Sequence, residues 1–301
     1  MINLKNLTVI IVTYRTTKKI IEDCIKSIDK KVKILIIENS KKFDHAQHFK
    51  KRFPKVKIVC SGKNLGYGKA NNLGLTLSKT DYALILNPDI ICEKKFFSNL
   101  SKIINNKIDF SIIGCQYSKD KIFMPAGYFD EKSNDIFKKR FYSNDLDNLT
   151  KVEWVTGCSM LINLKKFKNK KIFDKNFFLY FEEFDLCKSV VDRGGLIYSA
   201  KSLKVHHLGF KSSLGKNLNE KINAINVKEW HWMWSRFYFY KKNYSYPYAI
   251  KKLIGKLVKS IFKLLFYTIT FQTNNKNKYL FRFLGLFNSF LNRPSFYRGE
   301  N

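Results

Sequence analysis

Short apolar runs alternate with amphipathic segments along the first third of the chain. The runs at residues 7–13, 32–37, 56–60 and 82–86 predict buried strands, because a strand covered on both faces is apolar throughout. Between them, apolar residues recur every three or four positions, which predicts helices. This alternation is typical of an α/β fold with a Rossmann-like, mostly parallel sheet and helices on both faces.

The pattern is less regular after residue 115. Residues 130–150 are charged, with aromatic residues interleaved, and we expect a mobile loop there. Residues 154–162 predict a strand interrupted at Gly157, since a glycine inside a strand marks a bulge or a close approach. Residues 182–193 predict a helix whose first turn is acidic.

The chain after residue 219 is basic and rich in aromatic residues. Residues 230–240 are densely aromatic, and residues 250–265 place apolar residues and lysines on different faces of a predicted helix. Such a basic amphipathic helix suits a bilayer interface, where lysines reach the headgroups while the apolar face inserts. The alternative is that the apolar stripe packs on the rest of the chain. We favour the membrane and divide the chain into two regions, 1–219 and 220–301.

The net charge of +32 predicts that the protein is attracted to an anionic partner. Residues 201–301 contain 19 Lys and Arg against 3 acidic residues, and residues 230–299 contain no carboxylate. Part of the excess is explained equally well by a proteome rich in lysine. An anionic membrane surface fits the asymmetry better than nucleic acid, because no nucleic-acid-binding motif is present.

The six cysteines are scattered singly and form no C-x-x-C pair, which argues against a zinc site. We expect reduced core cysteines and a cytoplasmic protein. No secretory signal is predicted at the polar start of the chain, and no apolar run reaches the roughly 18–20 residues of a membrane-spanning helix.

Polar residues follow the predicted strands at the edge where open α/β sheets bind ligands. Pro88 ends the strand at residues 82–86, and Asp89 comes directly after it. We interpret Asp89 as the ligand of a divalent metal held against a nucleotide-sugar diphosphate. Glu38 follows the second strand and suits either a ribose or base N–H, or the cap of a helix or turn.

Two further motifs are ambiguous by themselves. Gly66 and Gly68 allow close approach to a ligand, but their spacing matches neither a dinucleotide fingerprint nor a Walker loop, and a plain turn explains them too. His206 and His207 are of a type that commonly binds metals, although adjacent histidines usually do not form a metal site.

Three acids, Glu182, Glu183 and Asp185, follow a stretch that is almost entirely aromatic. In the first turn of a helix they favour the macrodipole, which is sufficient as a structural explanation. A desolvated carboxylate in the same place would have a raised pKa and could act as a base.

Together, in this order, these motifs resemble the family-2 glycosyltransferases with the GT-A fold, most closely their rhamnosyltransferase-like bacterial branch. The resemblance covers about residues 7–213. The motifs are Ile11-Val-Thr-Tyr14, Ile37-Glu-Asn-Ser40, Asn64-Leu-Gly-Tyr-Gly68 with Asn71-Asn72 and Gly74, Leu86-Asn-Pro-Asp89, Thr156-Gly157, Phe178-Leu-Tyr-Phe-Glu-Glu-Phe-Asp-Leu-Cys187 and His207-x-Gly209-x-x-Ser212. The resemblance makes residues 1–219 a GT-A domain.

The resemblance implies a site for a nucleotide-sugar donor. Its nucleoside pocket would be lined by Thr13, Tyr14 and Glu38. The residues along the ribose and diphosphate would be Asn64, Gly66 and Asn71, and Asn87 and Gly157 would also bind the donor.

The resemblance also implies Mg²⁺ or Mn²⁺. Asp89 would be its main ligand, because Asn87-Pro88-Asp89 stands where the family has its Asp-x-Asp motif. Asn87 replaces the first acid and weakens the protein's own hold on the metal, so we expect the donor diphosphate to complete the site. His207 would be a further metal or diphosphate ligand, at the family's spacing to Gly209 and Ser212.

Glu183 matches the family's general base, which is more often aspartate, and Glu182 is the alternative. Asp185 would support the helix turn or the acceptor. A single displacement would invert the anomeric carbon. The implied acceptor is a lipid-linked or cell-surface polysaccharide at the cytoplasmic face of the membrane, and the branch suggests dTDP-rhamnose as donor. A non-catalytic, membrane-associated nucleotide-sugar-binding relative is the alternative, and the oligomeric state stays open.

Overall fold

The computed structural model describes residues 4–117, 124–208 and 218–299. The chain divides into two compact units. Unit 1 contains the residues up to Leu65, Lys69–Phe173 and the stretch from Leu186 to the end of the last strand. Unit 2 contains Gly66–Gly68, Asp174–Asp185 and the C-terminal helices. Each unit is described by itself.

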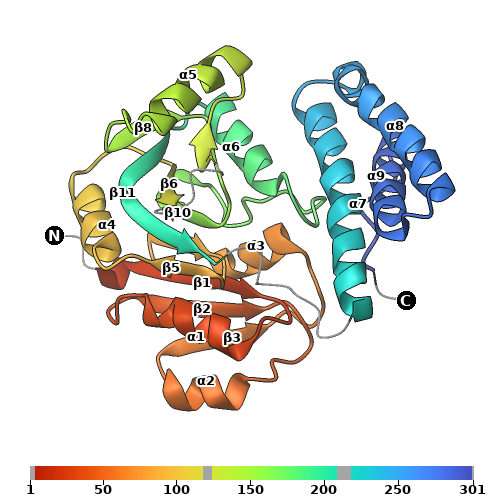
Figure 1. Ribbon diagram of the computed structural model, residues 1–301. Helices are drawn as coiled ribbons and strands as arrows, with labels where there is room; N and C mark the ends of the chain where they lie inside the picture. The colour runs from red at the N-terminus through yellow and green to blue at the C-terminus, as the bar shows by residue number, and fades with distance from the viewer. Residues whose placement is uncertain (1–3, 118–123, 209–217, 300–301) are drawn as a thin grey trace. The chain divides into compact units, whose positions relative to one another are not determined.

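Unit 1 is built on a nine-stranded sheet (Figure 1). Its strands are β1 (Leu7–Thr13), β2 (Lys33–Glu38), β3 (Val56–Cys60), β4 (Tyr82–Leu86), β5 (Ile90–Cys92), β6 (Ile112–Tyr117), β8 (Leu149–Val152), β10 (Ser159–Asn163) and β11 (Ile197–His207). The order is β3-β2-β1-β4-β10-β6-β11-β5, and β8 pairs with β11. Six strands (β1 to β4, β6 and β11) run in one direction, while β10, β5 and β8 oppose them. The predicted mostly parallel sheet is therefore confirmed.

Helices cover both faces of this sheet. Those assigned wholly or mainly to unit 1 are α1 (Lys18–Lys26), α2 (Ala46–Arg52), α3 (Tyr67–Leu77), α4 (Phe96–Asn105), α5 (Glu131–Tyr142) and α6 (Glu182–Asp192), the last of which begins in unit 2. The inward residues of α1 and α4 share one core cluster with Val9 and Ile11 of β1. On the opposite face α3 approaches so closely that a Cβ at Gly74 would lie 2.5 Å from a side-chain carbon of Ile10.

The prediction of a mobile loop at residues 130–150 is wrong. The segment forms α5 and β8, and a small two-stranded sheet of β7 (Ala126–Gly127) and β9 (Trp154–Val155) lies in the same unit. Asp130 caps α5 by accepting a hydrogen bond from the backbone N–H of Ser133. Phe137 is the one buried side chain of this helix, and so little burial leaves no apolar periodicity for the sequence to display.

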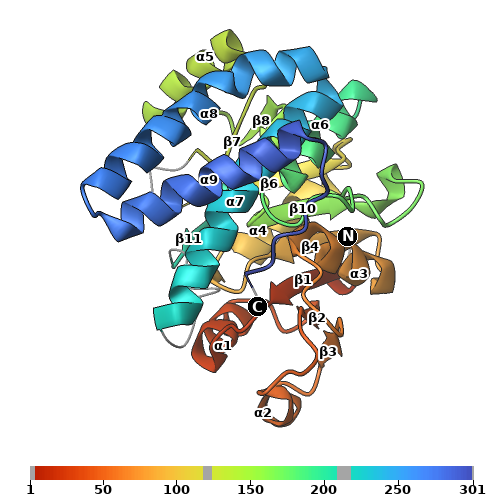
Figure 2. The same ribbon diagram turned by 90° about the vertical axis from the view of Figure 1, so that its right-hand side faces the viewer.

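Unit 2 contains α7 (Leu218–Asn243), α8 (Tyr246–Ile269) and α9 (Thr273–Phe290), which pack on one another (Figure 2). Their shared core consists of Met233, Phe237, Ala249, Leu253 and Leu286. None of the helices in the described ranges is long and apolar enough to cross a bilayer.

The aromatic stretch at residues 230–240 is largely core of unit 2. Trp230, Trp234, Phe237 and Phe239 are buried. The indole N–H of Trp234 donates to the Arg293 backbone oxygen at 3.0 Å, so this ring is anchored within the unit.

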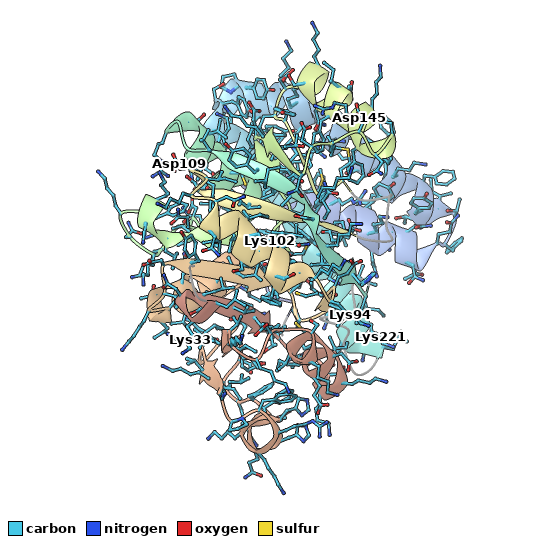
Figure 3. All side chains as sticks on the ribbon, turned by 90° about the vertical axis from the view of Figure 1, so that its left-hand side faces the viewer. Lys33, Lys94, Lys102, Asp109, Asp145 and Lys221 are labelled. Atoms are coloured by element: carbon cyan, nitrogen blue, oxygen red, sulfur yellow. The ribbon has the colours of Figure 1, made fainter. Side chains whose placement is uncertain are left out.

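Positive charge is distributed over both units. Figure 3 labels exposed side chains of unit 1 such as Lys33 on β2 and Lys102 on α4, together with Lys221 on α7. Because residues 201–301 carry 19 − 3 = +16 of the total +32, the first 200 residues carry the other +16. Charge alone therefore does not distinguish one unit as the membrane-binding part.

Candidate functional site

Asp89 lies just past β4 and is completely buried. Neither of its carboxylate oxygens has a hydrogen-bond partner within the described part of the chain, and the same holds for the side-chain oxygen of Asn87. Buried oxygens of this kind are costly unless a ligand completes them. Three unsatisfied oxygens at one strand end are the donor type that Mg²⁺ and Mn²⁺ accept.

His207 is brought to Asp89 by the sheet. The last residues of β11 pair with β5, with His207 opposite Ile90, and the backbone N–H of Leu208 donates to the Asp89 backbone oxygen at 2.9 Å. The His207 Nε2 atom lies 3.5 Å from Asp89 Oδ2. In the described ranges no group of three His, Cys, Asp or Glu side chains could hold a metal. The residues present therefore fit a divalent cation only as a partial ligand set that other oxygens must complete.

Tyr117, at the end of β6, is a neighbour of His207 that the sequence did not reveal. The two ring centroids lie 6.0 Å apart. Burial raises the pKa of the Tyr117 hydroxyl, so it stays protonated and contacts Cys158 and Thr156. The position of Tyr117 beside His207 depends on contacts between strands that are far apart in the sequence, and no local motif encodes such contacts.

Thr13 and Glu38 meet at the ends of the parallel strands β1 and β2, where they are paired in register. The Thr13 hydroxyl donates to Glu38 Oε2 at 2.6 Å, and both residues are buried. Burial raises the pKa of the Glu38 carboxyl, and the hydrogen bond from Thr13 opposes that rise. Tyr14 follows directly and carries the Arg15 guanidinium 5.3 Å from its ring centroid.

Asn39 organises the same edge, although no separate role is predicted for it from the sequence. Its amide donates to Asn64 Oδ1 at 2.9 Å, and its carbonyl accepts from the Leu65 backbone N–H at 2.9 Å. Its own backbone N–H donates to the Thr13 backbone oxygen at 2.7 Å. Through its side chain and its backbone N–H, Asn39 thus joins β1, β2 and the loop before α3, which places Asn64 beside the Thr13–Glu38 pair.

Close packing against the backbone requires a glycine at position 66. Its φ is +82°, and a Cβ would lie 2.3 Å from the Phe178 backbone oxygen. The backbone N–H of Tyr67 donates to that same oxygen at 2.9 Å. Gly66 therefore fixes the loop that precedes the acid cluster, and its contact with a donor stays a prediction.

We expect Gly66→Ala to unfold at a clearly lower temperature than the wild type, because the substitution adds a backbone clash to an unfavourable φ. Gly62→Ala is the matched control, since Gly62 has φ +83° but open space around a Cβ. The control should lose only the about 1–2 kcal/mol of the left-handed conformation. Equal melting temperatures for the two variants would contradict the packing role of Gly66.

The acid cluster in unit 2 follows an unusual backbone turn. Tyr180 and Phe181 both have positive φ, at 68° and 66°, although neither is glycine. Two successive residues in this region are strained and persist only when surrounding contacts fix them. Those contacts come from α7, where Ser235 donates to the Leu179 backbone oxygen at 2.8 Å and Trp232 packs on both rings.

Glu182 and Glu183 begin α6 in different environments. Glu182 is buried at 3% exposure, and its Oε2 has no hydrogen-bond partner among the described residues. Burial raises its pKa well above the usual range, and the charge of Glu183 adds to the rise. Glu183 is half-buried. Burial therefore favours the protonated form of the Glu182 carboxyl, which cannot act as a base in that form.

Asp185 is held in an ion-paired network. Lys242 Nζ lies 2.7 Å from Asp185 Oδ2 and 2.7 Å from Asp174 Oδ2, and Asn243 donates to Asp185 Oδ1 at 2.9 Å. Asp185 is buried, so these contacts replace the water that its charge would lose. They give it a structural task, the anchoring of the α6 turn to α7.

An exposed apolar stripe runs along α8, separate from the face that packs in unit 2. Its residues recur at helical spacing and are Ile254, Val258, Ile261, Phe262, Leu265 and Ile269. Exposure reaches 68% for Phe262 and 90% for Phe271 in the turn after the helix. The apolar residues predicted at 250–265 thus divide between two faces, because Leu253 is buried in the core.

The structure gathers the predicted residues in two places. In unit 1, Thr13, Glu38 and Asn64 lie at the ends of β1 and β2, and Asp89, Asn87 and His207 lie at the end of β4 beside β11. Asn71 on α3 is buried, and Gly157 lies buried in the turn between β9 and β10. Unit 2 holds Gly66 and the three acids. Gly209 and Ser212 lie outside the described residues.

Comparison with known proteins gives a family for most of the first two thirds of the chain. The model of glycosyl transferase family 2 matches residues 8–181, which is more than half of the chain. Rhamnosyltransferase WbbL of Escherichia coli (strain K12) is 28% identical over 144 residues, 42% of this chain and 54% of its own length. The low-salt glycan biosynthesis hexosyltransferase Agl10 of Haloferax volcanii is 24% identical over 192 residues, 61% of each chain. The matches thus span little more than half of these relatives.

One solved structure supports the fold. The mannosyltransferase PcManGT from Pyrobaculum calidifontis, in complex with GDP-Man and Mn²⁺, superposes with a TM-score of 0.52 over 95% of this chain and 87% of its own, at 13% identity. At that identity the similarity concerns the fold alone. It confirms the predicted GT-A architecture.

Proposed function

Because the chain belongs to glycosyl transferase family 2, we propose that it is a metal-dependent, inverting enzyme that moves a sugar from a nucleotide-sugar donor to a hydroxyl of a glycan acceptor. The observation that carries this proposal is the buried Asp89 carboxylate, whose two oxygens lack partners in the described ranges while His207 lies 3.5 Å away. Asp89, Asn87 and His207 would hold Mg²⁺ or Mn²⁺, which would supply charge to stabilise the departing diphosphate.

The chain's own residues divide the remaining tasks. Thr13, Tyr14 and Glu38 would receive the nucleoside, with Asn64 and Asn71 along the ribose and diphosphate. Glu183 would take the proton of the acceptor hydroxyl, whose oxygen then attacks the anomeric carbon in line and inverts it. The raised pKa of Glu182 favours Glu183 in this role.

The proposed donor sugar and acceptor are taken from what similar proteins are named for. A rhamnosyltransferase and a hexosyltransferase are similar in sequence, and the mannosyltransferase was solved with GDP-Man and Mn²⁺. We propose L-rhamnose from dTDP-rhamnose as the first donor to test, and a lipid-linked or cell-surface polysaccharide as acceptor.

A panel of nucleotide sugars with and without Mn²⁺, scored for hydrolysis and for protection against melting, tests this function. Protection together with Mn²⁺-dependent release of nucleoside diphosphate supports an enzyme. Protection without any release would instead identify a non-catalytic nucleotide-sugar-binding protein. An absence of both, across all donors, would contradict the proposal.

We also propose that the helices of residues 220–301 bind the cytoplasmic face of an anionic membrane. The α8 stripe supports this, because exposed apolar side chains on a helix with five lysines and no acid are typical of helices that lie in a bilayer interface. A lipid-linked acceptor would then be reached without diffusion through water.

We expect the variant Phe262→Asp/Leu265→Asp to bind phosphatidylglycerol vesicles at least about thirtyfold more weakly than the wild type. Each buried apolar side chain contributes about 2 kcal/mol, and the new carboxylates are repelled by the lipid. Ile136→Asp on α5 is the control, since Ile136 is 54% exposed but lies in unit 1. Vesicle sedimentation measures the difference, and unchanged binding of the double variant would refute insertion of α8.

A further inference from the structure

Arg236 on α7 is a half-buried cation without a matching acid. Its Nε atom is buried and has no hydrogen-bond partner within the residues that the structure describes. A guanidinium presents five donors in a fixed fork, and a buried one is normally paired with a carboxylate or a phosphate. The position of Arg236 among packed helices therefore needs an explanation.

The side chains around Arg236 add positive charge instead of compensating it. The charge of Arg236 is the main cause that lowers the pKa of Lys256 on α8, and partial burial, Lys259 and Arg282 add to this effect. Arg282 comes from α9, so basic groups of all three helices converge at one place.

Among the described residues one carboxylate reaches this cluster, and it pairs with Arg282 and not with Arg236 or Lys256. Glu229 on α7 is ion-paired with Arg282. It precedes Arg236 by seven residues, which corresponds to roughly 10 Å along a helix axis. Residues 230–299 contain no acidic residue. Like charges brought together at a helix junction repel one another, and an anion from outside would remove that repulsion.

We propose that Arg236 and Lys256 form a binding site for a phosphate group, separate from the donor site proposed at Asp89. The planar guanidinium matches two phosphate oxygens, and the lysine adds a point charge. The phosphate has two possible sources, the headgroup of an anionic lipid and a phosphate anion in solution. The lipid source rests on the proposed membrane function of unit 2, because α8 carries both Lys256 and the exposed apolar stripe.

The test compares Arg236→Gln with Lys221→Gln in the full chain. Lys221 is an exposed residue of the same helix, so both variants lose one charge from α7 (Figure 3). In the solution arm, inorganic phosphate is added in EDTA, which prevents metal-bridged binding at Asp89, and chloride matches the ionic strength. We expect phosphate to raise the melting temperature of the wild type and of Lys221→Gln, but not that of Arg236→Gln.

In the membrane arm, binding to phosphatidylglycerol vesicles is measured. Loss of one diffuse surface charge weakens such binding about fivefold, which is the expectation for Lys221→Gln. Arg236→Gln should weaken it at least about thirtyfold. If Arg236→Gln loses more vesicle binding than Lys221→Gln but keeps the melting shift with phosphate, the site binds a lipid headgroup. If it loses only the melting shift with phosphate, the site binds a soluble phosphate anion. Equal behaviour of the two variants in both arms overturns the proposal.

Folding and catalysis are controlled separately. Since Arg236 gives up no hydrogen bond at Nε, Arg236→Gln should melt no lower than the wild type without phosphate. Should it fail to fold, Lys256→Gln takes its place, because Lys256 is exposed. Hydrolysis of nucleotide sugars should be unchanged in either variant, so failure of the phosphate site and failure of the proposed transferase activity are distinguishable.

Discussion

Replacing Asp89 by asparagine is expected to lower kcat for sugar transfer at least about a hundredfold. The substitution keeps the shape of the side chain but removes the carboxylate that follows β4, so the ligand set proposed for Mg²⁺ or Mn²⁺ loses its charged member. Neither buried Asp89 oxygen accepts a hydrogen bond from the described residues, so their burial costs stability while no cation is bound. Asp89→Asn should therefore melt no lower than the wild type in EDTA.

The same variant separates a metal ligand from a structural residue. Wild-type protein should gain melting temperature with Mn²⁺ and the nucleoside diphosphate of its donor, and Asp89→Asn should not. Asp109→Asn, at an exposed aspartate of unit 1, is the matched control and should behave as wild type (Figure 3). A cation-dependent shift that survives in Asp89→Asn would exclude this residue as the principal ligand.

Replacing Glu183 by glutamine is expected to slow transfer by about a hundredfold to ten-thousandfold, the range that a general base contributes. Donor binding should persist, because the nucleoside and diphosphate residues are assigned to the ends of β1, β2 and β4. Single-turnover transfer and the melting shift with donor measure the two properties. Wild-type turnover in Glu183→Gln would remove this residue from the mechanism.

Glu182→Gln is the control with the same chemistry one residue earlier. Burial raises the pKa of Glu182, so the native carboxyl keeps its proton at a pH where the unfolded chain has lost it. The unfolded state then binds fewer protons, and stability contributed by this group falls as pH rises. Glu182→Gln should consequently melt above wild type by a margin that grows from about pH 4 upward, with transfer within about tenfold. A large loss of transfer in Glu182→Gln, with near-normal transfer in Glu183→Gln, would instead identify Glu182 as the base.

The strands and the α/β fold could be predicted because the buried strands of unit 1 are continuous apolar runs. The reversed direction of β10 could not be predicted. This strand runs opposite to both β4 and β6, and its direction depends on pairing between residues far apart. Helix α5 was missed because it buries only Phe137 among its twelve residues, which leaves no apolar stripe.

The candidate site was predictable where a side chain acts through its position after a strand, as with Thr13, Glu38 and Asp89. It was not predictable where function depends on tertiary contacts. Asn39 joins three segments through its side chain and its backbone N–H, and Tyr117 reaches His207 from another strand. Spacing alone also cannot separate the two apolar faces of α8, because residues that pack in the core and residues that stay exposed both recur every three or four positions.

The strained turn at Tyr180 and Phe181 has a consequence for the order in which the protein matures during synthesis. The Glu182–Glu183 pair leaves the ribosome about fifty residues before Trp232, Ser235 and Lys242, whose side chains fix that turn. Translation at about 5–20 residues per second leaves an interval of several seconds in which the strands carrying Asp89 can already pair. A nascent chain would therefore form the proposed donor pocket first, and the turn that holds the proposed base Glu183 only when α7 has been made.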